Sequence, residues 1–332
     1  MFMKSNLLVF IALFASSVEV LAKSLEQLNI YSFRKLELIA PIVSSFEKES
    51  GIKVNLVHGK SKYLLKRLEN DGEKSQADLL LTSDLSQLAN KKHLLQSFSK
   101  FENLEHVNKN LVDDEQYWVS ISIRARTIFS SVNTTLAVPE FYSDFNKKRY
   151  QGQFCIRDLS HSYNKELFAS LLSIGEKEDT YWLQNPNKLL VKRPTGNDRD
   201  QLRALAEGKC QFAIANHYYL DMLANSENKK DQLIASKLKR HWLKTHKGTT
   251  LISTTTAAIT KYAPNKSNAL VFMNYLLEDD TQKIYASQLF EFPVYTKNKQ
   301  DQTTLENNNF KMIPDVKAVK ASLSFLVNPS ML

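Results

Sequence analysis

Residues 27–57 have the sequence QLNIYSFRKLELIAPIVSSFEKESGIKVNLV, which predicts a strand over residues 27–32, a helix and a second strand. The helix is expected over residues 36–50, where apolar side chains recur at helical spacing. The second strand is expected over residues 52–57, where apolar and polar side chains alternate. A helix over residues 63–69 and a buried strand over residues 77–81 (ADLLL) follow. This β-α-β-α-β order predicts a parallel sheet flanked by helices.

Two of these expected strands end in polar segments, residues 31–34 (YSFR) and residues 82–84 (TSD). In parallel sheets of this kind, ligands bind beyond the carboxyl ends of the strands. We therefore expect both segments to border a binding site.

A second structural unit is expected after Trp118. Residues 119–129 predict a long strand that crosses between two lobes, and residues 250–260 predict the return crossing. Residues 225–230 (NSENKK) predict a solvated loop. A chain of 332 residues also exceeds one typical hydrophobic core, which favours two domains.

The net charge of the chain is +9, and its isoelectric point is near 9.2. A basic chain can attract nucleic acid or an anionic membrane surface. Here the basic residues are scattered and interrupted by acidic ones, as at Glu47-Lys48-Glu49, so we expect no nucleic-acid partner. The chain has 8 glycines, which argues against glycine-rich phosphate-binding loops.

Residues 1–22 have the pattern of a signal peptide. Lys4 supplies a positive charge, residues 7–15 (LLVFIALFA) are unbroken apolar, and residues 20–22 (VLA) match a signal-peptidase site. The apolar run is shorter than the roughly 20 residues that span a bilayer. We expect export of a mature chain that begins at Lys23, and a buried helix is the alternative. No cysteine follows the run, so we expect no lipid anchor.

The sequence has two cysteines, Cys155 and Cys210. An even number of cysteines in an exported chain predicts one disulfide, which would close a long loop. Two free buried thiols are the alternative. Two cysteines without a Cys-x-x-Cys motif make a poor zinc site.

The sequence contains no Gly-x-Ser-x-Gly, His-Glu-x-x-His or Walker-type motif. We therefore expect a binding protein and not an enzyme. An exported enzyme built on the same scaffold is the rival hypothesis.

Three tyrosines are candidate metal ligands. Tyr218 and Tyr219 follow a buried strand and open an expected helix, and Tyr163 has a similar strand-to-helix setting. A phenolate oxygen suits a hard trivalent cation, which must lower the phenol pKa from its usual value of about 10. Neighbouring side chains on a helix point about 100° apart, so both reach one ion only at a helix end or turn. Simple packing is the alternative role of this pair.

Residues 213–223 (AIANHYYLDML) and residues 29–34 (NIYSFR) resemble two motifs of the periplasmic ferric-iron-binding proteins of ABC importers. These motifs are Asn-Thr-Tyr-Tyr and the opening Asn-Ile-Tyr-Ser-x-Arg. Further segments match in the same order over most of the mature chain. They are GIKVNLV (51–57), ADLLLTSD (77–84), IRART (123–127), CIR (155–157), YN (163–164), GND (196–198) and APN (263–265). Several motifs in one order are more specific than any single motif.

The resemblance implies a two-lobe α/β periplasmic binding protein fold, in which each lobe is a mixed sheet flanked by helices and crossing strands form the hinge. It also implies a monomer that captures ferric iron in the periplasm and delivers it to an ABC permease. The expected lobes are residues 23–120 plus 250–300 and residues 121–249 plus 301–332.

At the level of residues, the resemblance implies that Tyr163, Tyr218 and Tyr219 bind Fe(3+). It also implies that the basic pair Arg124 and Arg126 lies near the cleft, where an arginine would hold a co-bound anion such as carbonate. An ordinary ion pair is the alternative role of these arginines. The disulfide of the family is similarly placed, which supports the pairing of Cys155 with Cys210.

The chain departs from the family in its first loop. Many members continue the opening motif with His-Tyr, and these two residues reach the iron from the other lobe. Lys35 and Leu36 stand there in this chain. Leucine cannot ligate a metal, and an ammonium group is repelled by a trivalent cation, although Lys35 could face a bound anion. Either three tyrosines act with external anions or water, or the same scaffold binds another cargo, such as a chelated metal, an anion or a small cation.

Overall fold

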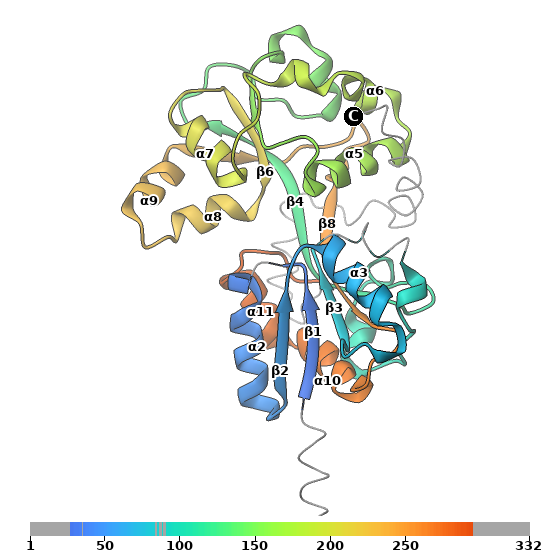
Figure 1. The fold of residues 1–332 in the computed structure, drawn as a ribbon. Helices are drawn as coiled ribbons and strands as arrows, with labels where there is room; N and C mark the ends of the chain where they lie inside the picture. The colour runs from blue at the N-terminus through green and yellow to red at the C-terminus, as the bar shows by residue number, and fades with distance from the viewer. Residues whose placement is uncertain (1–26, 35, 84, 86–87, 89–90, 295–332) are drawn as a thin grey trace, which may run out of the picture.

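The computed structural model describes residues 27–34, 36–83, 85, 88 and 91–294. Figure 1 shows two α/β lobes, and strands β4 (Val119–Ser131) and β8 (Ile252–Ile259) run from one lobe into the other. The predicted fold class and both crossing strands are therefore confirmed. The predicted signal peptide, Lys35 and the segment 301–332 that was expected in the second lobe lie outside the described residues.

The strands of both lobes form one continuous sheet in the order β2-β1-β3-β8-β4-β6-β5, and β7 also pairs with β4. In the first lobe β1 pairs in parallel with β2 and β3, as the β-α-β-α-β order predicted. In the second lobe β5 pairs in parallel with β6, and β4 runs antiparallel to β6. The remaining strands are β1 (Gln27–Ser32), β2 (Lys53–His58), β3 (Leu79–Thr82), β5 (Phe154–Ile156), β6 (Phe212–Asn216) and β7 (Leu238–His241).

Helices cover the sheet in both lobes (Figure 1). They are α2 (Leu36–Ser50), α3 (Ser61–Asp71), α5 (Ser162–Ile174), α6 (Lys177–Thr180), α7 (Asp198–Ala206), α8 (Tyr218–Ala224), α9 (Lys229–Ser236), α10 (Lys266–Leu276) and α11 (Asp279–Ser287). The loop expected over residues 225–230 is shorter than predicted, because its last two residues already belong to α9. The Asn228 side chain accepts a hydrogen bond from the Lys230 backbone N–H at 2.9 Å and so begins α9 two residues earlier.

Each lobe has its own hydrophobic core. Phe46 packs against Phe272 in the first lobe, and Phe145 packs against Trp182 in the second. Along β4, Ile121 and Ile123 join the first-lobe core, whereas Ile128 and Phe129 join two neighbouring clusters of the second lobe. One strand therefore contributes side chains to the cores of both lobes. The exact residue ranges expected for the two lobes stay a prediction.

A buried ion pair ties the crossing strands to the first lobe. The Arg34 guanidinium contacts both carboxylate oxygens of Glu291, at 2.7 and 3.0 Å, and the Ser122 hydroxyl on β4 also donates to Glu291. Burial raises the pKa of Glu291, but Arg34 and Arg124 outweigh this effect and lower it. The Glu291 carboxylate therefore stays charged beside the hinge.

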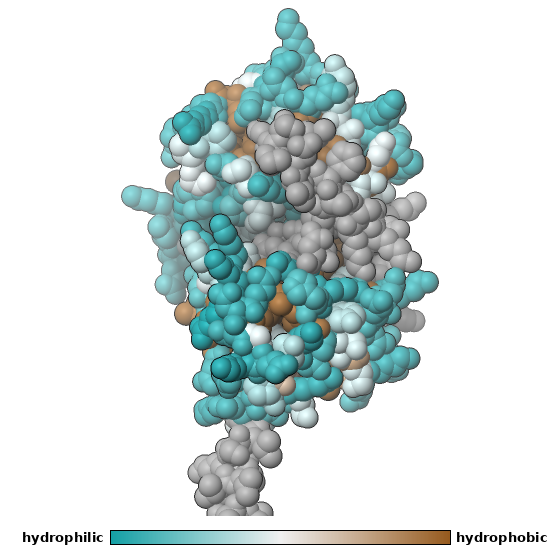
Figure 2. All heavy atoms as spheres, turned by 45° about the vertical axis from the view of Figure 1, so that its right-hand side comes forward, coloured by the Kyte–Doolittle hydropathy of each residue, from teal (hydrophilic) through white to brown (hydrophobic). Residues whose placement is uncertain are grey.

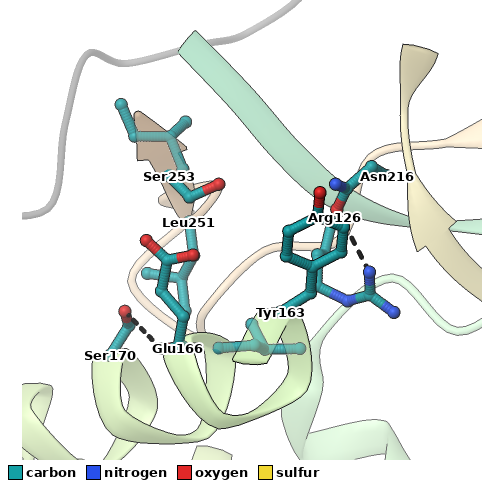
Figure 3. Close-up of a pocket in the computed structure, with 9 residues that line it drawn as sticks. Arg126, Tyr163, Glu166, Ser170, Asn216, Leu251 and Ser253 are labelled. Atoms are coloured by element: carbon teal, nitrogen blue, oxygen red, sulfur yellow. Dashed lines mark hydrogen bonds between the residues drawn. The ribbon is translucent and has the colours of Figure 1, made fainter. Parts of the chain in front are cut away.

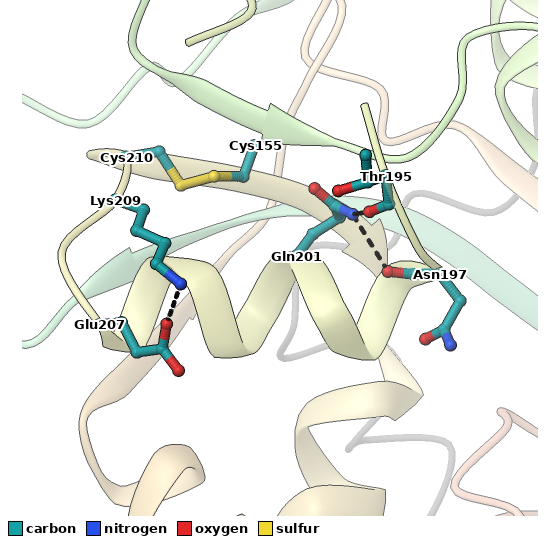
Figure 4. Close-up of a disulfide and its surroundings, with 7 residues drawn as sticks. All are labelled: Cys155, Thr195, Asn197, Gln201, Glu207, Lys209 and Cys210. Atoms are coloured by element: carbon teal, nitrogen blue, oxygen red, sulfur yellow. Dashed lines mark hydrogen bonds and ion pairs between the residues drawn. A yellow bond between two sulfur atoms is a disulfide. The ribbon is translucent and has the colours of Figure 1, made fainter. Parts of the chain in front are cut away.

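The predicted disulfide between Cys155 and Cys210 is present (Figure 4). It links β5 to the segment between α7 and β6, and its Cα atoms are 5.8 Å apart. Both cysteines are buried beside Phe129 and Leu205. The bond therefore fixes the strand that leads into α5 to the segment that leads into β6.

Removal of this disulfide is expected to lower the free energy of unfolding by roughly 4 kcal/mol, because the unfolded chain then loses the constraint of a long loop. The loop joins positions 55 residues apart. Chemical denaturation of the Cys155→Ser/Cys210→Ser double variant measures this loss. Thiol labelling of the denatured, unreduced protein should find no free cysteine. Stoichiometric labelling would show that the two thiols are not paired.

The surface in Figure 2 is mainly hydrophilic, and its hydrophobic residues form small separate patches. The most exposed large apolar side chains include Tyr63 in the first lobe and Tyr181 and Leu233 in the second. Within the described part of the chain, no helix combines the length and the apolar character needed to cross a membrane.

Candidate metal centre

Two parallel strands place the three candidate tyrosines at one edge of the second-lobe sheet. Strand β5 leads into α5, where Tyr163 is the second residue, and β6 leads through His217 into α8, where Tyr218 is the first residue. Because β5 and β6 are parallel neighbours, their carboxyl ends lie at the same edge. The sheet therefore gathers tyrosines that are 55 residues apart in the sequence.

Tyr218 and Tyr219 lie side by side at the beginning of α8. Their ring centroids are 4.4 Å apart, and both side chains are buried. The Asn216 amide donates a hydrogen bond to the Tyr218 hydroxyl at 3.2 Å. This is the helix end at which both neighbouring hydroxyls can approach one ion.

The environment keeps both phenols protonated. Burial raises the pKa of Tyr218 well above 10, and the nearby hydroxyls of Tyr163 and Tyr219 raise it further. Burial likewise raises the pKa of Tyr219, with additional contributions from Tyr163 and Asp198. Arg124 opposes the shift at Tyr218, but it does not cancel it. A strong cation is therefore needed to turn these phenols into phenolates.

Tyr163 is surrounded by three guanidinium groups. The Cζ atoms of Arg157, Arg124 and Arg126 lie 5.4, 5.5 and 6.0 Å from the centre of its ring. The Nδ1 atom of His161 accepts a hydrogen bond from the Tyr163 backbone N–H at 3.2 Å and caps α5. Three positive charges therefore lie close to the Tyr163 ring.

The three arginines differ in how their charges are balanced. Arg126 and Arg157 share the buried carboxylate of Asp198, at 3.1 and 2.9 Å. Arg124 instead donates to two backbone carbonyls, those of Ser83 in the first lobe and Thr254 on β8. Arg126 thus forms the ordinary ion pair that was the alternative to anion binding, whereas Arg124 connects the two lobes.

Each of these three guanidinium groups keeps a buried Nε–H that has no acceptor among the described residues. Buried N–H groups in folded proteins are rarely left without a partner. Three such donors around one tyrosine fit an anion or an oxygen-rich ligand.

A small pocket lies beside Tyr163. Its polar lining residues are Arg126, Tyr163, Glu166, Ser170, Asn216 and Ser253. In Figure 3, Tyr163 and Glu166 project from α5 into this pocket, toward residues of β4, β6 and β8. Glu166 was not among the residues expected at the site, although its spacing of three residues from Tyr163 places it on the same helix face.

His217 occupies the position of the threonine in the Asn-Thr-Tyr-Tyr motif, but it has a structural role. Its ring stacks on Phe292 at 4.4 Å, and its Nδ1 accepts a hydrogen bond from the Ala125 backbone N–H at 3.1 Å. Burial and the charge of Arg240 lower its pKa to about 3. The imidazole is therefore held against Phe292, and its Nδ1 is bonded to β4.

The first-lobe segments expected at the site have other contacts in the described structure. Tyr31 is buried in the first-lobe core, with Arg67 over its ring at 5.4 Å, and Arg34 pairs with Glu291. Leu36 is 52% exposed at the beginning of α2. Ser83 does contact the site, through its carbonyl and Arg124.

A second group of potential ligands lies apart from the tyrosines. Glu176, Glu178 and His246 bring one ligand atom each within 4.8 Å of one another. Glu176 is already paired with Lys247, and the Nδ1 atom of His246 lies 3.2 Å from Asp179. Glu176 and His246 are therefore already engaged with neighbouring side chains.

Two α/β lobes, joined by crossing strands and carrying a polar site beside the crossing, define a two-lobe binding protein. The family model described as bacterial extracellular solute-binding protein matches residues 74–320. Iron uptake protein A1 of Synechocystis is 30% identical over 293 residues, which cover 86% of this chain and 81% of that protein. The chain belongs to the bacterial extracellular solute-binding proteins.

Solved structures agree with this assignment. The ferric binding protein from Campylobacter jejuni has a TM-score of 0.81 and 31% identity, and the match covers 90% of this chain and 97% of that one. A Trichodesmium protein, IdiA or FutA, was solved in complex with iron and citrate. Its TM-score is 0.78 at 29% identity, and the match covers 91% of this chain and 97% of that one. These structures share the two-lobe periplasmic binding protein fold.

Proposed function

We propose that this protein is a periplasmic solute-binding protein that captures ferric iron as its cargo and delivers it to an ABC permease. The single observation that carries the proposal is the meeting of Tyr163, Tyr218 and Tyr219 at one sheet edge, beside three guanidinium groups. The relatives named for iron uptake and ferric binding support the same cargo. The protein acts as a monomer that binds and releases its cargo without turnover.

In the proposed site, the hydroxyls of Tyr163, Tyr218 and Tyr219 lose their protons and bind the ferric ion. Three phenolates balance the three positive charges of the ion, and the hard oxygen donors suit a hard cation. Arg124 stabilises the negative ligands and holds a co-bound anion such as carbonate. Because Arg124 also contacts the Ser83 carbonyl of the first lobe, charge at the site is linked to the position of that lobe.

The alternative cargoes are a chelated metal, an anion or a small cation. The observation that favours them is Leu36, which offers no donor atom where many relatives carry a tyrosine. A titration of the iron-free protein with ferric ion tests the proposal. Ferric binding should produce a visible phenolate-to-iron charge-transfer band, and absence of the band with bicarbonate or citrate present would favour another cargo.

Introducing tyrosine at Leu36 is expected to strengthen ferric binding. Leu36 is exposed at the beginning of α2, so a phenol there can be added without opening the core. The Lys35→His/Leu36→Tyr double variant should bind the ion at least about 10-fold more tightly, because it adds two donors and removes a positive charge. Competition with a chelator of known affinity measures the change. The Leu36→Phe variant, which adds a ring without a hydroxyl, should show no gain.

A further inference from the structure

We propose that residues 290–292, which we call the hinge strap, hold the metal-binding end of α8 in place, with Phe292 as the positioning residue. This inference rests on the proposed function, because it concerns how the first lobe controls the position of two of the tyrosines that bind the ion. Phe292 acts on these tyrosines through His217.

The hinge strap leaves the first lobe and returns to it within a few residues. It follows α11, which packs in the first lobe. Glu291 ties the strap to that lobe through its buried ion pair. Val294 ends the excursion, since it lies in the first-lobe core and its backbone N–H donates to the Gln282 side chain at 2.9 Å. Between these attachments, Phe290 and Phe292 reach the second lobe.

Phe292 and His217 occupy neighbouring positions along one edge of β4. The backbone N–H and C=O of Phe292 bond to the C=O and N–H of Ile123, at 2.9 and 2.8 Å. His217 bonds twice to Ala125, with its backbone N–H to the carbonyl at 2.9 Å and with its Nδ1 to the N–H at 3.1 Å. Backbone groups two residues apart in a strand point to the same edge. The strap therefore meets β4 directly beside the turn that begins α8.

The Phe292 ring holds the His217 ring at this edge. The two rings are stacked, with centroids 4.4 Å apart and an angle of 13° between their planes. The His217 ring also makes an edge contact with Tyr218, at 5.7 Å between centroids. Phe290 adds a second contact, because it packs against the hydrophobic cluster that contains Tyr218 and Tyr219. The strap is thus linked to the beginning of α8 by two aromatic side chains.

Helix α8 needs this support from outside. It has seven residues, and in the described structure its N-cap residue His217 makes no side-chain capping bond, because that side chain is bonded to β4. A helix this short depends on tertiary packing more than on its own propensity. Arg240 supports the same turn, by donating to the His217 carbonyl at 3.2 Å. Any movement of this turn would move both phenols away from a shared ion.

The backbone of the strap is itself strained. Phe290 has a φ of 56°, in the left-handed region that a bulky side chain rarely adopts. Such a conformation persists only where the surrounding contacts fix it. The contacts that follow it are the ion pair of Glu291 in the first lobe and the ring stack of Phe292 in the second. The path of the strap is therefore set by both lobes together.

A double-mutant cycle in ferric affinity tests the proposal, with iron supplied as the acetohydroxamate complex and the charge-transfer band as the signal. His217→Thr introduces the residue of the family motif and removes the ring on which Phe292 stacks. Phe292→Ala and His217→Thr should each weaken ferric binding at least about 10-fold, as residues that orient metal ligands typically do. The double variant should bind no more weakly than His217→Thr alone, because both changes break one contact. Fully additive losses would overturn the proposal.

Phe101→Ala is the matched control. Phe101 is also a partly buried phenylalanine at the first-lobe core, and it packs against Phe98 at 5.7 Å between centroids. This variant should lose thermal stability to a similar degree as Phe292→Ala and keep wild-type ferric affinity. Equal losses of affinity in the two variants would mean that general destabilisation explains the effect, and the positioning role would be wrong.

Hydrogen exchange of the iron-free protein separates the strap from the choice of cargo. Phe292→Ala should speed amide exchange over residues 217–224, whereas Phe101→Ala should leave it at the wild-type rate. Phe292→Leu, which removes the ring and keeps apolar bulk, should give the same result if the alanine variant does not fold. Unchanged exchange in α8 would overturn the proposal. If wild type takes up no ferric ion while exchange in α8 still rises, the proposed function fails and the strap is confirmed as the support of α8.

Discussion

Tyr218→Phe is expected to abolish the visible charge-transfer band of the ferric complex and to weaken ferric binding at least about 1,000-fold. The substitution removes an anionic ligand, which costs more than the 10- to 100-fold typical of a group that only supports a ligand. It retains the ring, whose centroid lies 4.4 Å from that of Tyr219, so the core should stay filled. The fold loses the hydrogen bond from Asn216, a loss of about 1 kcal/mol.

Tyr150→Phe provides the matched control. Tyr150 is also a buried tyrosine of the second lobe, and its hydroxyl donates to the Ala137 carbonyl at 2.9 Å. Loss of that hydroxyl should affect stability to a similar degree and leave ferric affinity unchanged. Equal affinity of the Tyr218→Phe and Tyr150→Phe variants would contradict the assignment of Tyr218 as a ligand. If Tyr163→Phe and Tyr219→Phe also kept the band, the whole ligand set would be wrong.

Ferric affinity is expected to fall at least about 100-fold for each unit by which the pH is lowered. In the metal-free protein, burial raises the pKa values of Tyr218 and Tyr219, so both are neutral phenols at neutral pH. Only their deprotonated forms bind the ion, so binding releases at least two protons. Ferric affinity falls as the pH is lowered, because a higher proton concentration opposes the release of these protons and so favours the metal-free protein. Acid should therefore bleach the charge-transfer band.

Two measurements check this pH dependence. Chelator competition between about pH 5.5 and 7.5 gives the slope of affinity against pH, after correction for protonation of the chelator. Titration in weak buffer counts the released protons. Tyr219→Phe should release one proton fewer than wild type, and Tyr150→Phe should release the same number. A slope of one or less would mean that at least one phenol of the pair is not a ligand.

The sequence predicted the elements whose signal is local. Residues 27–32 and 36–50 were expected as a strand and a helix, and β1 and α2 have the same limits. The crossing strands were also expected, because residues 119–129 (VSISIRARTIF) largely alternate apolar and polar side chains and residues 250–260 (TLISTTTAAIT) are rich in β-branched ones. The pattern of apolar and polar residues that identifies a helix or a strand depends only on residues that are close together in the sequence. The end of the loop at 225–230 was missed because one side chain, Asn228, fixes the beginning of α9.

At the candidate site, the sequence identified the chemical types and motif positions of Tyr163, Tyr218 and Tyr219. It also predicted the disulfide, which needed only the count of cysteines and the expected export. It did not distinguish Arg124 from Arg126, because that difference depends on which carboxylate each arginine meets. Asp198, which neutralises Arg126, is 72 residues away in the sequence.

Only the tertiary structure brought the site together. The parallel pairing of β5 with β6 sets Tyr163 beside Tyr218, and the burial that follows raises the pKa of the phenols. It also places Glu166 in the pocket and leaves the Nε–H groups of three arginines without acceptors among the described residues. The physical reason is the range of the interactions. Helical and strand periodicity is encoded by adjacent residues, whereas burial and charge pairing arise from the register of strands that are distant in the sequence.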